Sequence, residues 1–205
     1  MKNVKKKELE ITLQKIKQPE KIKVELEQYS TPASIASDIL WKAYYNGDIE
    51  GKFVIDLGCG TGIFSIGCSL LNAKRVVGID IDDEMIEMAK REAKKFNVHV
   101  EFISMDIEEF DEKGDVVIMN PPFGAQYSNR KADRIFIKKA MEISNAFYSL
   151  HLKESANFIK KLVESRGWKI IEEKNYRFPI KASFPFHEKK VEYYNVLMIH
   201  GKRSK

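Results

Sequence analysis

The chain has 205 residues, 43% of them hydrophobic and 32% charged, with a formal net charge of +5 and two cysteines. The length predicts a single domain over residues 1–205. We also expect a cytoplasmic location, because no apolar run approaches the roughly 20 residues of a bilayer span and the lysine-rich start lacks the apolar segment of a secretory signal. The charge permits a polyanionic partner, and Cys59 and Cys68 are too few and wrongly spaced for a zinc cluster, so we expect no metal.

The N-terminal residues 1–27 are rich in charge, but Leu9, Leu13 and Ile16 fall on one face of a helix. We therefore predict a helical N-terminal extension over residues 1–27 and a core over residues 28–205. The extension either covers the core with its apolar face or presents its lysines to RNA phosphates.

Polar residues precede the next predicted helix, which runs from Ala33 to Tyr45. Thr31 is a candidate N-cap, and Pro32 suits the first turn of a helix, where a missing backbone N–H leaves no bond unmade. A helix start offers free amides, and Gln28 and Thr31 beside it could line a ligand cleft.

A glycine-rich loop follows the first predicted strand, residues 53–57. Gly58, Gly60 and Gly62 permit a tight turn and let a ligand approach the backbone at the start of the next helix, residues 63–71. A loop of this kind is weak evidence by itself, so the residues around it decide how it is interpreted.

The strand over residues 75–80 ends in an acid, Asp80, about eighteen residues after the last loop glycine. A carboxylate at that place binds a ribose in nucleotide-binding βαβ units. The loop lacks the Gly-Lys-Ser/Thr of triphosphate-binding proteins, and Asp56 just before the glycines would repel a pyrophosphate. An acid there suits a cationic ligand with an amino-acid tail, such as S-adenosylmethionine.

A helix over residues 82–96 and a third strand over residues 98–104 come next. Met85 and Ala89 lie on the inward face of that helix. Asp106 follows the strand, where an acid could accept a hydrogen bond from an adenine amino group; a solvated loop position is the alternative.

The fourth predicted strand, residues 115–119, ends at Asn120-Pro121-Pro122-Phe123. Each proline removes a backbone donor and fixes φ, so the strand cannot continue past Asn120. Ligands of parallel α/β sheets bind outside the carboxyl ends of the strands. We therefore expect an amide, two carbonyl groups and an aromatic ring to lie together at a binding site.

This tetrapeptide suits methylation of an amino group that is conjugated to a ring or a carbonyl group. Such a nitrogen is a poor nucleophile, because its lone pair is delocalised. The Asn120 side-chain oxygen and the Pro121 carbonyl could accept both N–H bonds and aim the lone pair at a methyl donor. Phe123 could stack on a base taken out of its helix. A strand followed by a proline turn is the structural alternative.

The rest of the chain continues the alternation of helices and strands. Helices are predicted over residues 135–145 and 153–165, and strands over 146–151, 168–176 and 192–199. The polar segment 124–134 predicts a mobile loop at the mouth of the site or an ordinary solvated loop. The link 177–190 interleaves aromatic residues with lysines, which suits either nucleic acid binding or core packing.

The whole pattern resembles the class I S-adenosylmethionine-dependent methyltransferases, and Asn120 to Phe123 resembles their (Asn/Asp)-Pro-Pro-(Phe/Tyr/Trp) signature of amino-group methylation. A closer resemblance, to the methyltransferase-like five family, is carried by Leu26-Glu27-Gln28-Tyr29, Thr31-Pro32, the loop Asp56 to Gly62, the run Val117 to Gly124, Tyr148-Ser149-Leu150-His151 and Phe186-His187-Glu188-Lys189-Lys190. Ser30 departs from the family, in which proline is usual.

The resemblance implies a Rossmann-like, doubly wound α/β sheet of seven strands, mostly parallel with an antiparallel C-terminal strand. It implies N6 methylation of an adenosine in small-subunit ribosomal RNA, with S-adenosyl-L-methionine as cofactor and S-adenosyl-L-homocysteine as product. The lysine-rich, compact character suggests an archaeal member. Eukaryotic relatives work with a small zinc-ribbon activator that adds its sheet edge, so such a protein is a candidate partner besides RNA.

The resemblance, together with the pattern of the glycine loop, also assigns the site. The predicted cofactor-binding residues are Gln28, Thr31, Asp56, Gly58, Gly60, Thr61, Gly62, Ile63, Asp80, Asp106 and Ile107, and the predicted catalytic residues are Asn120, Pro121, Pro122 and Phe123. Other acceptors remain open, namely guanine-N2, cytosine-N4 and protein glutamine-N5. A cofactor-binding RNA-assembly factor and a nicotinamide dehydrogenase are the alternatives from other classes.

Overall fold

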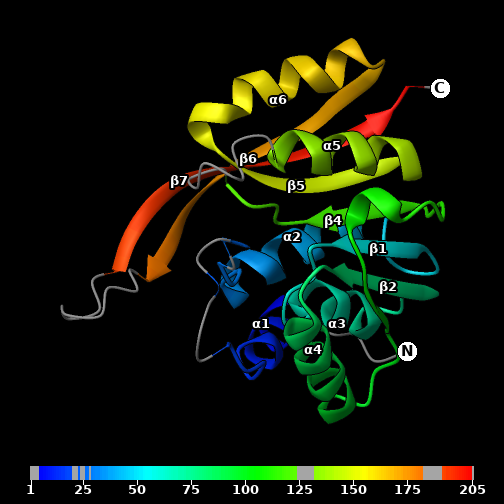
Figure 1. Ribbon diagram of the computed structural model, residues 1–205, viewed down its shortest axis with the longest axis vertical. Helices are drawn as coiled ribbons and strands as arrows, with labels where there is room; N and C mark the ends of the chain where they lie inside the picture. The colour runs from blue at the N-terminus through cyan, green and yellow to red at the C-terminus, as the bar shows by residue number, and fades with distance from the viewer. Residues whose placement is uncertain are drawn as a thin grey trace.

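The structure is a computed structural model that describes residues 5–19, 23, 26–27, 29–123, 132–181 and 191–204. These residues form a seven-stranded sheet in the order β3-β2-β1-β4-β5-β7-β6 (Figure 1). The strands are β1 (Phe53–Leu57), β2 (Arg75–Asp80), β3 (Glu101–Ser104), β4 (Val116–Met119), β5 (Ala146–Leu152), β6 (Trp168–Lys181) and β7 (Val191–Arg203). The helices are α1 (Lys6–Leu13), α2 (Ala33–Tyr45), α3 (Ile63–Leu70), α4 (Asp83–Lys95), α5 (Ala132–Ile143), α6 (Lys153–Ser165) and the short 3-10 helix η2 (Ile107–Glu109).

Strands β1 to β5 pair in parallel, and β7 runs antiparallel to both of its neighbours, β5 and β6. The order of the strands reverses at β1, which pairs with β2 on one side and β4 on the other. Such a reversal opens a crevice at the carboxyl ends of the strands. The predicted doubly wound α/β fold, mostly parallel with an antiparallel C-terminal strand, is confirmed.

Helices cover both faces of the sheet (Figure 1). Successive side chains of β1 explain why, because Val54 packs in a core shared with α1, α2 and α3, whereas Ile55 and Leu57 pack in a core shared with α5 and α6. Strands covered on both faces read as continuous apolar runs. The four residues of β4 are accordingly all buried.

The N-terminal extension packs on the core through α1. Leu9 and Leu13 of α1 are each 1% exposed, and Ile16, which follows the end of the helix, is 3% exposed. The extension therefore covers the core, as the first of the two alternatives predicts, but its helix is confined to Lys6–Leu13 within the described residues. None of the helices in the described ranges is long and apolar enough to cross a membrane.

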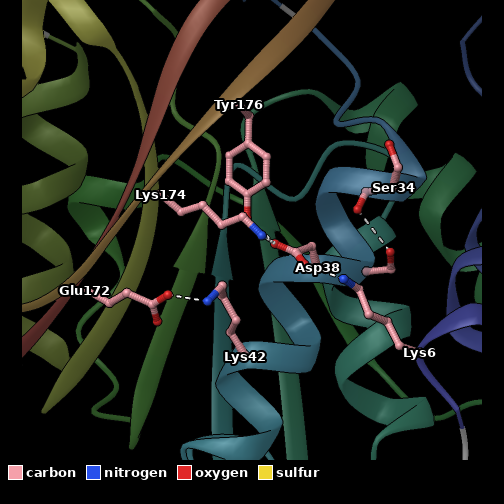
Figure 2. A network of polar contacts seen from close by, with 8 residues as sticks. Lys6, Ser34, Asp38, Lys42, Glu172, Lys174 and Tyr176 are labelled. Atoms are coloured by element: carbon pink, nitrogen blue, oxygen red, sulfur yellow. Dashed lines mark hydrogen bonds and ion pairs between the residues drawn. The ribbon is translucent and has the colours of Figure 1, made fainter.

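A polar network also joins α1, α2 and β6 (Figure 2). Asp38 of α2 accepts hydrogen bonds from Lys6 of α1, from Lys174 Nζ at 2.6 Å and from Tyr176 Oη at 2.6 Å, the latter two on β6. One turn further along α2, Lys42 pairs with Glu172. The helix that precedes β1 is therefore fixed to the C-terminal strands.

Some predicted boundaries are wrong. The N-cap position of α2 is Pro32 and the helix begins at Ala33, so Thr31 is not the cap. β3 begins at Glu101 rather than at residue 98. β6 and β7 extend beyond the predicted ranges, because the two strands pair with each other along their length. The pairing runs from Trp168 opposite Arg203 to Lys181 opposite Val191, and it needs no apolar face. The resulting hairpin reaches beyond the other strands (Figure 1).

Candidate active site

A cavity of about 290 Å³ lies at the carboxyl ends of the central strands. Its wall contains the glycine loop after β1, Asp80 at the end of β2, Asp106 after β3 and Asn120 after β4. The segment before α2 and the first turns of α5 complete the wall. The reversal of strand order at β1 therefore coincides with the cavity, as expected for a ligand site of this fold.

The structure brings most of the predicted site residues together. The wall includes Thr31, Gly58, Gly60, Thr61, Ile63, Asp80, Asp106 and Ile107 of the predicted cofactor site, and Asn120 and Pro122 of the predicted catalytic group. Asp56, Gly62, Pro121 and Phe123 stand outside the wall as formed by the described residues. Gln28 lies outside the described residues.

The glycine loop needs glycine at several of its positions. The φ angles of Gly58, Gly60 and Gly62 are 69°, 53° and 83°, in the left-handed region that other residues rarely adopt. A Cβ atom on Gly58 would also lie 3.0 Å from the ring of Phe136. Loop backbone and α5 therefore approach each other closely at the cavity.

The carboxyl group of Asp80 connects the end of β2 to the glycine loop. Its Oδ2 accepts a hydrogen bond from the Gly60 amide at 2.8 Å, and its Oδ1 accepts one from the Asp82 amide at 3.0 Å. Burial raises the pKa of this carboxyl above its ordinary value, while the two amide bonds oppose that shift. Because each carboxylate oxygen has a second lone pair, Asp80 can still accept bonds from a ligand hydroxyl.

Asp56 has a different environment, although it stands just before the loop. Its side chain is buried, and its Oδ2 accepts hydrogen bonds from the Ser65 amide at 2.9 Å and the Ser65 hydroxyl at 2.5 Å. Burial raises the pKa of the Asp56 carboxyl to about 7, against the lowering effect of the two Ser65 bonds. Asp56 thus links β1 to α3 instead of lining the cavity.

The amide of Asn120 is held from the segment before α2. Its Nδ2 donates hydrogen bonds to the Tyr29 carbonyl at 3.3 Å and to Thr31 Oγ1 at 3.1 Å. Its Oδ1 is buried and has no hydrogen-bond partner among the described residues. A buried acceptor without a partner is costly, so a ligand donor at this point would be favoured.

Phe123 packs between two other aromatic rings. Its side chain is 8% exposed, with the Tyr29 ring stacked at a centroid distance of 6.1 Å and the Phe178 ring edge-on at 5.5 Å. The ring therefore has little open surface in this structure. The ring face predicted to stack on a base is therefore covered by Tyr29.

Several wall residues were not predicted from the sequence. Ile81, Met85, Tyr29 and Phe136 contribute apolar surface to the cavity wall. Ile81 directly follows the strand-ending acid and is 59% exposed, so its position next to Asp80 was a usable signal. Phe136 had no such signal, because its place depends on how α5 crosses the sheet.

Two predicted binding segments lie largely outside the described residues. Of the loop 124–134, residues 124–131 lie outside the described residues, and so do residues 182–190 of the link 177–190. Among the residues that are described, no group of three or more His, Cys, Asp or Glu side chains could hold a metal ion. Cys59 and Cys68 are buried free thiols, and burial raises the pKa of each.

Comparison with known proteins agrees with this geometry. Residues 8–121 match the family model of ribosomal protein L11 methyltransferase (PrmA). The chain is 45% identical to the protein MJ0284 of Methanocaldococcus jannaschii, over 92% of this chain and 90% of that protein. It is 36% identical to the zebrafish (Danio rerio) rRNA N(6)-adenosine-methyltransferase METTL5, over 90% of this chain and 92% of that protein.

A solved structure is similar over the full length. A Pyrococcus horikoshii protein, described as a candidate RNA methyltransferase, superimposes with a TM-score of 0.90 at 40% sequence identity and covers 100% of both chains. The likeness therefore extends to the N-terminal extension and the C-terminal strands, beyond the part that the family model matches.

Proposed function

Because the chain belongs to the METTL5 family of class I S-adenosylmethionine-dependent methyltransferases, we propose that it methylates N6 of an adenosine in small-subunit ribosomal RNA. The observation that carries this proposal is the amide of Asn120. Its oxygen is buried and lacks a partner among the described residues, and the residue itself belongs to the wall of the cavity. An acceptor in that position suits an incoming amino group.

The cavity wall fits S-adenosylmethionine, which would supply an electrophilic methyl group when bound. The backbone of the glycine loop, open at Gly60, would bind the amino-acid tail. Asp80 would accept hydrogen bonds from the ribose hydroxyls. Ile81 and Ile107 would contact the adenine faces, and Asp106 its amino group.

The residues of this chain would then prepare the acceptor nitrogen. Asn120 Oδ1 and the Pro121 carbonyl would accept its two N–H bonds, which turns the lone pair out of the ring plane and favours the positive charge that develops on nitrogen. Holding the two reactants in line contributes further to the rate. The methylated nitrogen would lose its proton to water, so this scheme assigns no general base.

A zinc-ribbon activator is a further part of the proposal. The edge strands of the sheet are β3 and β6, and an activator would extend one of them. Exposed apolar side chains near an edge favour such a partner, and Ile171 on β6 is 52% exposed.

Transfer of labelled methyl from S-adenosylmethionine to unmodified small-subunit ribosomal RNA, followed by nucleoside digestion, tests the proposal. We expect label in N6-methyladenosine and a loss of at least about 100-fold in rate for Asn120→Ala. Thr12→Val, on α1, is the control and should match the wild type.

Label in N2-methylguanosine would keep the chemistry and refute the adenine acceptor. Label in protein glutamine and none in RNA, with a zinc-ribbon partner present, would refute the RNA substrate. If Asn120→Ala transferred methyl as fast as the wild type, the assigned role of Asn120 would be wrong. An assembly factor with incidental catalysis would keep its cellular role in that variant, which complementation measures.

A further inference from the structure

The orientation of the Asn120 amide follows from its neighbours. The Tyr29 carbonyl can only accept a hydrogen bond, so the Asn120 atom at 3.3 Å from it must be the amide nitrogen. The same nitrogen donates to Thr31 Oγ1 at 3.1 Å. Both amide protons are thus used on the protein side, and Oδ1 is left buried and without a partner among the described residues.

We propose that Thr31 is a positioning residue for Asn120, which rests on the function proposed above. With the Tyr29 carbonyl, its hydroxyl holds the amide so that Oδ1, rather than Nδ2, meets the amino group of the acceptor. Rotation of the amide by half a turn would break the bond to the Tyr29 carbonyl and bring Oδ1 against that oxygen, and Thr31 Oγ1 would have to change from acceptor to donor. The rotated amide would also place its Nδ2 donor against the N–H groups of the amine that receives the methyl group.

The surroundings of Thr31 suit this role. The residue is 5% exposed and lines the cavity beside Asn120. The helix start does not use its hydroxyl, because Pro32 holds the N-cap position of α2. Amides of Ile35 and Ala36 bond the Pro32 carbonyl at 3.0 Å and 2.9 Å, so the backbone next to Thr31 is part of a rigid helix start.

The network at Asp38 adds to this rigidity. It joins the second turn of α2 to α1 and β6, so the helix that carries the Thr31 segment is fixed to two other elements. A side chain on a rigid element holds its partner more closely than one on a loop. Thr31 therefore connects the fold to the amide that would act on the substrate.

Three variants test the inference. Thr31→Val removes the hydroxyl with little change in shape, Thr31→Ser keeps it, and Thr12→Val removes a hydroxyl that bonds the Glu8 carbonyl on α1. For Thr31→Val we expect kcat at saturating S-adenosylmethionine to fall about tenfold. Thr31→Ser should stay within about twofold of the wild type, as should Thr12→Val.

Two readouts separate positioning from other roles. In the nuclear magnetic resonance spectrum, the Asn120 side-chain amide signals should shift and exchange faster in Thr31→Val and remain at their wild-type positions in Thr31→Ser. The Kd for S-adenosylhomocysteine should change less than about twofold in Thr31→Val, since one lost cofactor hydrogen bond would weaken binding about fivefold or more.

An unchanged kcat together with unchanged Asn120 signals in Thr31→Val would overturn the inference. A fall in cofactor affinity with wild-type kcat at saturation would also overturn it and return Thr31 to the cofactor site. If the wild type itself transfers no methyl to RNA, the proposed function fails, while the Asn120 signals still decide whether Thr31 orients the amide.

Discussion

Two carboxyl groups flank the glycine loop, and their hydrogen-bond partners give them different tasks. Asp80 accepts from two backbone amides and keeps a place in the cavity wall. Asp56 gives one oxygen to the amide and hydroxyl of Ser65 and is 1% exposed. The carboxyl group that reaches the cavity wall is therefore that of Asp80, while Asp56 belongs to the packing of β1 against α3.

Asp56 makes the stability of the protein depend on pH. Burial raises its pKa from 3.8 to about 7, so the folded protein holds this proton more tightly than the unfolded chain. This contribution to stability is complete below pH 3.8 and is lost as the pH rises through 7. In urea unfolding, the free energy of unfolding of the wild type should fall by up to about 1.4 kcal/mol per pH unit between pH 4 and 7, and Asp56→Asn should not show this fall.

Asp111→Asn provides a surface comparison, because it changes the same chemical group where the side chain is 84% exposed, although it also weakens the ion pair with Lys139 at 3.3 Å. The Asp111→Asn variant should still show the fall in stability between pH 4 and 7 that Asp56 causes. If Asp56→Asn also shows this fall, the carboxyl of Asp56 does not hold its proton in the folded protein.

At the scale of elements, the polar network at Asp38 joins α2 to α1 and β6. Asp38 takes hydrogen bonds from α1 and from β6 (Figure 2), which joins the N-terminal extension to the C-terminal hairpin across the core. Burial acts to raise the pKa of Asp38, but the bonds from Lys174, Lys6 and Tyr176 outweigh it and lower the pKa to about 2.

Replacing Asp38 should loosen these three elements together. Asp38→Asn removes the charge that pairs with two lysines, one 43% and one 40% exposed, and we expect a loss of about 1–2 kcal/mol in the free energy of unfolding. The folded pKa is lowered, so the stabilisation is present above pH 3.8 and disappears as the pH falls through 2. Chemical unfolding at pH 7 and pH 2 measures both effects.

Glu172→Gln is the matched variant, since it breaks the neighbouring pair with Lys42 but leaves Asp38 intact. It should reduce stability by less than Asp38→Asn. Equal losses from the two substitutions would show that the bonds across to α1 and Tyr176 add nothing to a simple ion pair.

The elements that the sequence predicted best are those with both faces buried. β1 and β2 match their predicted bounds, because an apolar run between turn residues marks such a strand at both ends. The extent of β6 and β7 could not be predicted in this way, since their outer parts are stabilised by each other's backbone and Val191 to Asn195 are exposed. Thr31 followed by Pro32 has the local pattern of a cap, but a tertiary contact with Asn120 takes the hydroxyl instead.

At the scale of the whole molecule, the site depends on strand order as much as on motifs. The glycine loop, Asp80, Asp106 and Asn120 follow four different strands, and the parallel order β3-β2-β1-β4 brings them to one edge. Their convergence was predictable, because each motif stands at a strand end. The contribution of Phe136 was not, because no local pattern specifies where α5 packs.

A site assembled from so many elements should couple ligand binding to global stability. At a concentration of 100 Kd, a ligand that binds only the folded state stabilises it by about 2.7 kcal/mol. For a domain of this size that corresponds to an increase in Tm of about 5–10 °C. We expect S-adenosylhomocysteine to produce this increase in the wild type.

Asp80→Ala should lose most of that increase at the same ligand concentration, because Asp80 both faces the proposed ribose position and holds the Gly60 amide. The variant must first be shown to unfold cooperatively without ligand, so that its response is a matter of binding and not of folding. Glu172→Gln, at a residue that does not line the cavity, should retain the full increase. A normal response in Asp80→Ala would mean that the cofactor takes its affinity from the loop backbone and the apolar wall, and that the acid after β2 serves only to hold the loop.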